Sequence, residues 1–72
     1  MTQDISTKYI ELNSFLKVVG IANTGGRAKL TIRAGEIKVN DEIETRNKRK
    51  LHAGDTVEFD GRKYIVDEKV VR

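Results

Sequence analysis

The hydrophobic pattern of this chain changes its period at Gly35, and this change limits the folds that the chain can adopt. Before Gly35, apolar residues recur three and four positions apart, at Leu12, Phe15, Leu16 and Val19. After it, polar and apolar residues alternate, at Glu36, Ile37, Lys38, Val39 and Asn40. The first period is typical of an amphipathic helix and the second of a half-buried strand. The sequence therefore predicts an α+β fold with helices first and strands after them.

The first helix is expected to follow a short strand at residues 8–11 and to lie in the core. Asn13 or Ser14 can serve as its N-cap, because both side chains accept a hydrogen bond from a free N–H group of the first turn. Gly20 is placed to end the helix.

The second helix is expected from about Gly26 to Ala34. Thr24 or Gly25 can cap its start, and Gly35 suits the position just past its end. Helical spacing turns three of its residues toward the core: Ala28, Thr31 and Ile32.

The residues after Gly35 are expected to form a small twisted antiparallel sheet built from hairpins. The first hairpin turns at Asn40-Asp41, because both residue types tolerate a positive φ. Its second strand spans residues 42–45, with Ile43 facing inward.

A second hairpin is expected at Asp60-Gly61, with the last strand at residues 62–67. Two segments are expected outside regular structure. Residues 46–50 contain no apolar side chain and should protrude as a loop, and residues 69–72 should form a fraying tail.

The full expectation is one α+β domain, residues 1–72, with two helices packed on a small twisted antiparallel sheet.

A chain this short buries only about 60% of the surface that it exposes when unfolded, which leaves little material for a catalytic pocket. It has no cysteine and a single histidine, His52, so disulfides and the usual zinc sites are excluded. No carboxylate pair, nucleophile–base set or phosphate-binding loop is present. We therefore predict no catalytic, cofactor-binding or metal site, and expect His52 to be exposed or to cap a turn.

The N-terminal residues lack the basic start and apolar stretch of a signal peptide. The longest apolar-rich stretch, Phe15 to Ala22, is too short to span a bilayer. We therefore expect a cytoplasmic protein with no membrane partner, and a monomer is the default.

The positive charge is concentrated in the middle of the chain. The formal net charge is +3, and residues 25–50 hold eight basic and four acidic residues. The remaining residues hold six basic and seven acidic side chains. Clustered lysine and arginine attract a polyanion, although a solvated charged surface gives the same pattern.

Nine residues of this middle part are the candidate contacts for such a partner: Arg27, Lys29, Arg33, Lys38, Asn40, Arg46, Lys48, Arg49 and Lys50. Arg27 opens the second helix, where N–H groups attract anions. Residues 46–50 are the densest cluster, with four cations in five positions. Both phenylalanines are expected in the core, whereas Tyr9 and Tyr64 are left open. Because so few aromatic side chains are expected at the surface, recognition of backbone and shape is favoured over base stacking.

An ordered set of residues also resembles a known family. The set comprises Gly26-Arg27-Ala28, Ile32, Gly35, Ile37, Val39-Asn40-Asp41, Leu51, Gly54-Asp55 and Val57. It resembles the S4-type RNA-binding domain, named after a small-subunit ribosomal protein. Three further stretches are similar to the stand-alone bacterial YaaA/YbcJ-like members: Phe15-Leu16-Lys17, Thr24-Gly25-Gly26 with Ala28-Lys29, and Glu44-Thr45-Arg46 with Lys48-Arg49 and Leu51.

The resemblance implies a compact α-L unit that lays one basic face on structured RNA, such as ribosomal RNA or a ribosomal precursor. This domain is often appended to a catalytic domain, as in some pseudouridine synthases and tyrosyl-tRNA synthetases. Nothing is appended here, so the resemblance implies binding without chemistry. All nine candidates are then expected to contact RNA.

Other functions stay open on the sequence alone. A protein-interaction module would use the basic segment to dock an acidic replication or ribosome-associated partner. Duplex DNA binding is less favoured, because the second helix is short and opens with two glycines. A ubiquitin-like sulfur carrier is disfavoured, because the chain ends without terminal glycines.

Overall fold

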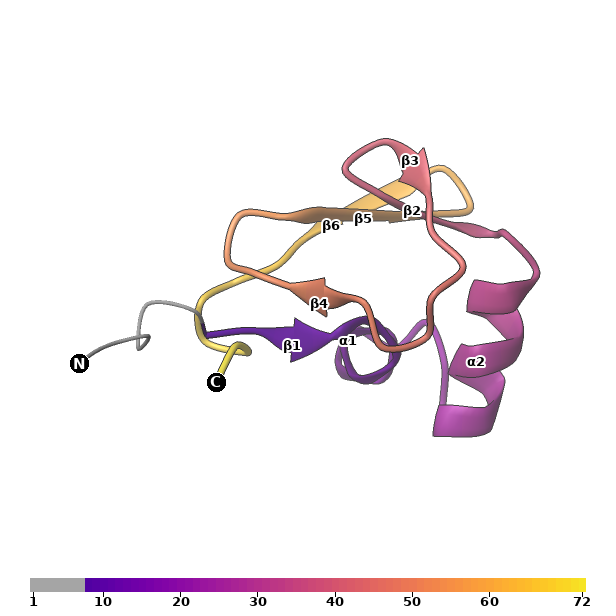
Figure 1. Ribbon diagram of the computed structural model, residues 1–72, viewed down its shortest axis with the longest axis horizontal. Helices are drawn as coiled ribbons and strands as arrows, with labels where there is room; N and C mark the ends of the chain where they lie inside the picture. The colour runs from indigo at the N-terminus through magenta and orange to yellow at the C-terminus, as the bar shows by residue number, and fades with distance from the viewer. Residues whose placement is uncertain (1–7) are drawn as a thin grey trace.

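The computed structural model describes residues 8–72 and confirms the α+β fold, with two helices and antiparallel strands (Figure 1). Residues 1–7 of the predicted domain lie outside the described residues. The elements are β1 (Ile10–Glu11), α1 (Leu12–Val18), α2 (Gly25–Arg33), β2 (Ile37–Val39), β3 (Glu42–Ile43), β4 (Lys50–Leu51), β5 (Thr56–Phe59) and β6 (Arg62–Ile65).

The described strands form two antiparallel sheets rather than the one sheet that the sequence predicted. Four strands pair in the order β3-β2-β5-β6, and β1 pairs separately with β4. Both helices lie on the same side of the four-stranded sheet as the β1–β4 pair (Figure 1). The second sheet was missed because β1 and β4 have only two residues each and are far apart in the sequence.

The core lies between the four-stranded sheet, the helices and the β1–β4 pair. Its buried apolar residues are Leu12, Phe15, Leu16, Ala22, Ala28, Ile32, Ile37, Val39, Leu51, Val57, Val66 and Val71. Phe59 and Tyr64 are partly buried and pack against this cluster. The predicted helical core residues are thus confirmed, except that Val19 and Thr31 are only half-buried.

The start of α1 differs from the prediction. The helix begins at Leu12, and its N-cap position, Glu11, makes no side-chain cap hydrogen bond. Asn13 and Ser14 both lie inside the first turn, where the N–H group of Ser14 donates to Asn13 Oδ1 at 2.8 Å. The prediction of either residue as N-cap was therefore wrong. Gly20 follows the helix with a φ of +83°, as expected.

Helix α2 follows the prediction closely. Its N-cap is Thr24, whose side-chain oxygen accepts a hydrogen bond from the N–H group of Arg27 at 3.1 Å. Gly35, just beyond the C-cap Ala34, has the left-handed φ of +78° that suits glycine at this position.

Both predicted hairpin turns are confirmed. Asn40 and Asp41 have φ values of +51° and +71°, and Asp60 and Gly61 have φ values of +53° and +78°. Positive φ at both central residues is the pattern of a two-residue turn that matches the twist of its strands.

The prediction that Ile43 faces inward was wrong. The two-residue turn pairs Val39 with Glu42 and Lys38 with Ile43. Residues that pair directly across two strands point to the same face of a sheet. Ile43 therefore shares the exposed face of Lys38 and is 62% exposed. Glu44, the next residue, turns inward and is 7% exposed.

The C-terminal residues are held in place, contrary to the prediction of a fraying tail. The N–H group of Arg72 donates to the carbonyl oxygen of Tyr9 at 3.0 Å, and the N–H group of Tyr9 donates to the carbonyl oxygen of Arg72 at 3.0 Å. Val71 is 8% exposed within the core. Apolar burial and this reciprocal pair of hydrogen bonds offset the entropy of fraying.

Candidate nucleic-acid interface

Residues 46–50, referred to here as the basic segment, do not protrude as the sequence predicted. Their backbone is hydrogen-bonded to α1 and β1. The N–H groups of Leu12 and Asn13 donate to the carbonyl oxygens of Arg49 and Asn47, at 2.8 and 3.1 Å. The first N–H groups of a helix have no acceptor within it. The basic segment supplies the acceptors that α1 lacks at its start, and Lys50 then pairs with Glu11 in the β1–β4 ladder. Figure 1 shows the segment from β3 to β4 passing beside α1.

Glu44 holds two arginines of this segment. Arg46 donates from Nε to Glu44 Oε2 at 2.9 Å and from Nη2 to Oε1 at 3.1 Å. Arg49 donates from Nη1 to Oε1 at 2.6 Å. The backbone N–H group of Arg46 donates to Oε2 at 2.9 Å. Both carboxylate oxygens of Glu44 therefore accept two hydrogen bonds each.

The arginines keep this buried carboxylate ionised. The side-chain hydrogen bonds from Arg46 are the largest cause that lowers the pKa of Glu44, which falls to about 2, whereas burial acts in the opposite direction. The backbone N–H group of Arg46 and the side chain of Arg49 lower the pKa further. The same pair raises the pKa of Arg46. Charge-assisted hydrogen bonds of this kind are about twice as strong as neutral ones.

Four cations line one hollow of about 430 Å³, referred to here as the cationic hollow: Arg46, Lys48, Arg49 and Lys50. Every described residue that lines it is basic, and Glu44 pairs with two of them. Arg46 and Arg49 stay 72% and 29% exposed in their side chains despite the ion pairs. With Glu44 included, the group carries a net charge of +3, so the hollow is an electropositive concavity suited to an anion.

Tyr9 lies beside the cationic hollow. Its ring centroid is 4.9 Å from Nζ of Lys50, which is within the range of a cation–π contact. The pairing of β1 with β4 brings Tyr9, which precedes β1, close to Lys50 in β4. The half-buried ring limits where the ammonium group of Lys50, one of the four lining residues, can move.

The structure divides the three candidates on α2 between two flanks. Successive residues of a helix are about 100° apart, so residues four positions apart share a face. Arg27 and Thr31 line a hollow with Ile21, Ala22, Asn23 and Phe59. Lys29 and Arg33 lie across the buried stripe of Ala28 and Ile32, on the opposite flank. Both are exposed, as is Arg27.

The candidates on the sheet have intramolecular neighbours. Lys38 is exposed on the outer face, directly across from Glu58 and Ile43. The amide of Asn40 accepts from the Thr56 N–H group at 3.0 Å and donates to Asp55 at 3.3 Å. Its side chain therefore already joins the first hairpin to β5, and RNA would have to share it.

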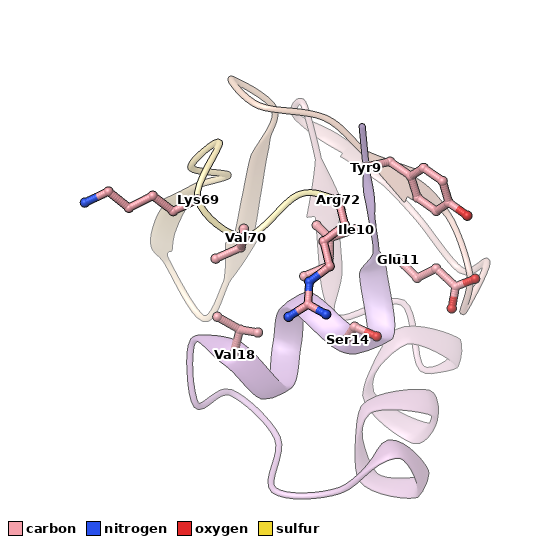
Figure 2. A pocket seen from close by; sticks show the side chains of 8 residues that line it. All are labelled: Tyr9, Ile10, Glu11, Ser14, Val18, Lys69, Val70 and Arg72. Atoms are coloured by element: carbon pink, nitrogen blue, oxygen red, sulfur yellow. The ribbon is translucent and has the colours of Figure 1, made fainter. Parts of the chain in front are cut away.

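A larger hollow, with a volume of about 540 Å³, lies between α1, β1 and the C-terminal residues. Figure 2 shows the side chains of Tyr9 and Glu11 extending to one side and that of Lys69 to the other. Val18, Ile10 and Val70 also line it. Size alone would favour this hollow, but its charged lining residues are of mixed sign, with Glu11 beside Lys69 and Arg72. We therefore place the candidate site at the cationic hollow.

His52 is exposed, as expected, but it has an acidic neighbour that the sequence did not suggest. The backbone N–H group of His52 donates to Asp55 Oδ2 at 2.8 Å, and the ring Nδ1 lies 3.9 Å from the same oxygen.

Within residues 8–72, no cluster of three or more His, Cys, Asp or Glu side chains is placed to hold a metal ion. No helix in that range has the length and apolar character required to cross a membrane.

Comparison with known proteins identifies the family. The family model of the S4 domain matches residues 3–67. The chain belongs to the S4 domain family. This confirms the resemblance drawn from the sequence.

A protein of Bacillus subtilis (strain 168), named "Probable ribosome maturation protein RlbA", is 44% identical over 57 residues, covering 79% of this chain and 80% of the relative. YbcJ of Escherichia coli (strain K12) is 42% identical over 53 residues, covering 74% of this chain and 76% of the relative. The solution structure of Escherichia coli YbcJ, described as revealing an alpha-L motif involved in RNA-binding, has a TM-score of 0.63 and 34% identity, with 90% of each chain covered. The family and these names confirm the prediction that the chain is not an enzyme.

Sequence reasoning missed Glu44 as part of the site. The residue stands two positions before Arg46 and reads as an exposed strand residue in an alternating pattern. The available signal was the hairpin register, which turns Glu44 to the face of Ile37. The N–H group of Glu44 donates to the carbonyl oxygen of Ile37 at 2.9 Å, which continues that register.

Proposed function

We propose that this S4 domain, acting as one unit over residues 1–72, binds structured RNA through the cationic hollow. Its family supports RNA binding, as does the alpha-L motif described for its structural neighbour. The observation that carries the proposal is a hollow whose lining residues, within residues 8–72, are all basic, on a backbone hydrogen-bonded to α1 and β1. The name of the Bacillus subtilis relative favours ribosomal RNA or a ribosomal precursor as the ligand, and therefore a cytoplasmic location.

The proposed mechanism is displacement of counterions from RNA phosphates. The main contacts are Arg46, Lys48, Arg49 and Lys50. Further contacts are proposed at Arg27, Lys29, Arg33, Lys38 and Asn40. If about five of the cations meet phosphates, the slope of log K against log salt lies between about −3.5 and −4.5.

Cellular crosslinking tests the proposal. The test variant is Lys48→Ala with Lys50→Ala, which leaves the arginine pairs of Glu44 in place. The control variant, Lys17→Ala with Lys69→Ala, removes the same charge from exposed positions outside the cationic hollow. RNA fragments recovered with the wild type should concentrate in one structured RNA, persist in the control and fall sharply in the test variant. Equal recovery from all three proteins would contradict the proposal and favour an acidic protein partner.

A further inference from the structure

Glu44 places a negative charge inside a surface proposed to bind a polyanion. An acidic residue at such a site weakens long-range attraction to phosphates. Asp41 and Glu42 are exposed at the nearby hairpin, where their carboxylates are well solvated. Glu44 is instead 7% exposed and lies against the two arginines. Its position therefore calls for an explanation other than surface solvation.

The contacts of Glu44 fix the arrangement of the two arginines. Arg46 is held by two parallel N–H···O bonds, the geometry that gives arginine its directional preference for carboxylates. Arg49 is held on the same carboxylate at 2.6 Å. A guanidinium group has five N–H donors, so both arginines keep donors that Glu44 does not use. The exposed fraction of Arg46, 72%, shows that its outer edge still faces solvent.

Fixing these side chains in advance reduces the entropy lost on binding. Immobilising a long side chain at an interface costs conformational entropy, which weakens binding. This saving is realised only by a ligand whose phosphates already match the fixed arrangement. A base-paired stem holds its phosphates in a regular array, whereas a flexible single strand must first be ordered.

We propose that Glu44 is a positioning residue: by holding Arg46 and Arg49 in one arrangement, it makes the cationic hollow select base-paired RNA over single-stranded RNA of equal charge. This inference rests on the proposed function. It predicts that removing the negative charge of Glu44 weakens binding to a stem, whereas electrostatics alone predicts that it strengthens binding.

The first test uses the free protein. In ¹⁵N NMR spectra, the Nε–H group of Arg46 and the Nη1–H group of Arg49, which donate to Glu44, should give distinct signals that exchange slowly with water. Glu44→Gln should move both signals toward the averaged position of free arginine. Averaged arginine signals in the wild type would overturn the inference whatever the RNA results are.

The second test compares an RNA hairpin with an unstructured single strand that has the same number of phosphates. Glu44→Gln should weaken hairpin binding by about tenfold and change single-strand binding less than about twofold, because only the hairpin gains from fixed arginines. The control, Glu42→Gln, removes the same charge from an exposed position and should bind both RNAs equally well or slightly better.

A third variant guards against a folding defect in Glu44→Gln. Arg46→Lys keeps the charge and the Glu44–Arg49 pair but cannot form the parallel pair of bonds. It should also lose hairpin affinity and keep single-strand affinity. Tighter hairpin binding by Glu44→Gln, or unchanged hairpin binding by Arg46→Lys, would overturn the inference. Failure of the wild type to bind either RNA would instead overturn the proposed function and, with it, this inference.

Discussion

Burial and ion pairing act in opposite directions on the single residue Glu44. Burial disfavours the ionised carboxylate, whereas hydrogen bonds from Arg46 and Arg49 favour it, and the hydrogen bonds prevail. The folded-state pKa of about 2 lies below the ordinary value of 4.5. The unfolded chain therefore binds a proton at this residue more readily than the folded protein does, which links folding to pH.

The stability from this carboxylate should be fully present above about pH 4.5 and disappear as the pH falls toward about 2. Glu44→Gln should lower the unfolding free energy by about 1–3 kcal/mol at pH 7, because it removes hydrogen bonds to charged groups. The difference from the wild type should shrink as the pH approaches 2. Urea unfolding at several pH values measures it. A difference that stays constant across this range would contradict the assigned ion pairing.

The same residue shows why local pattern reading failed here. Alternation placed Ile43 inward because it is apolar, but the turn at Asn40-Asp41, predicted correctly, already fixed the register. With Lys38 facing outward, its partner Ile43 must face outward and Glu44 must face inward. The sequence contained the correct answer once turn length was combined with strand pairing. The ion pairs of Glu44 could not be predicted in this way, because they depend on where the chain places residues 46–49 after the hairpin.

At the scale of elements, helix α1 and the basic segment support each other. The helix has no side-chain cap at its start, and the segment has no apolar residue to bury. The carbonyl oxygens of Asn47 and Arg49 accept hydrogen bonds from the first N–H groups of the helix. These same bonds hold the backbone of the segment in place. Composition alone could not predict this contact, because it uses backbone atoms that every residue has. The capping residue of α2 was predictable, since Thr24 acts through its own side chain.

Two glycines should respond in opposite ways to alanine. Gly26 lies in α2, where an added Cβ meets only Thr24 Oγ1 at 4.0 Å, so Gly26→Ala should stabilise the protein by about 0.5–1 kcal/mol. Gly61 has a φ of +78° in the second hairpin turn, so Gly61→Ala should destabilise it by about 1 kcal/mol or more. Chemical denaturation of both variants measures the changes. Effects of the same sign would contradict the assigned backbone conformations.

The C-terminal residues offer a second test at this scale. Val71→Ala should lower the unfolding free energy by about 1–2 kcal/mol, because it removes buried methyl groups. The control, Val18→Ala, alters an exposed valine and should change stability little. Thermal unfolding of the two variants separates the cases. Equal effects would indicate that residues 69–72 fray in solution.

For the whole molecule, the sequence predicted the α+β class, both helices and both hairpin turns, because these follow from period and turn chemistry. The family resemblance rested on an ordered set of residues from Gly26 to Val57 and on further stretches that begin at Phe15, and the S4 match confirms it. The sequence did not predict the separate β1–β4 pair or the division of the candidate cations. That division follows from helix geometry on α2 and from sheet register at Lys38. Four of the nine candidates line one common hollow: Arg46, Lys48, Arg49 and Lys50. The main contacts of the proposed interface therefore occupy a smaller surface than charge counting suggested.

The most direct test is the salt dependence of RNA binding by the wild type, Lys48→Ala and Lys69→Ala. Lys48 lines the cationic hollow and forms no ion pair with a described residue, so its replacement changes charge with little effect on the fold. Binding to a ribosomal RNA hairpin should weaken in Lys48→Ala, and the slope of log K against log salt should become shallower by about 1. Lys69→Ala should keep the wild-type slope. An unchanged slope in Lys48→Ala, or an equal change in Lys69→Ala, would contradict the claim that RNA binds at the cationic hollow.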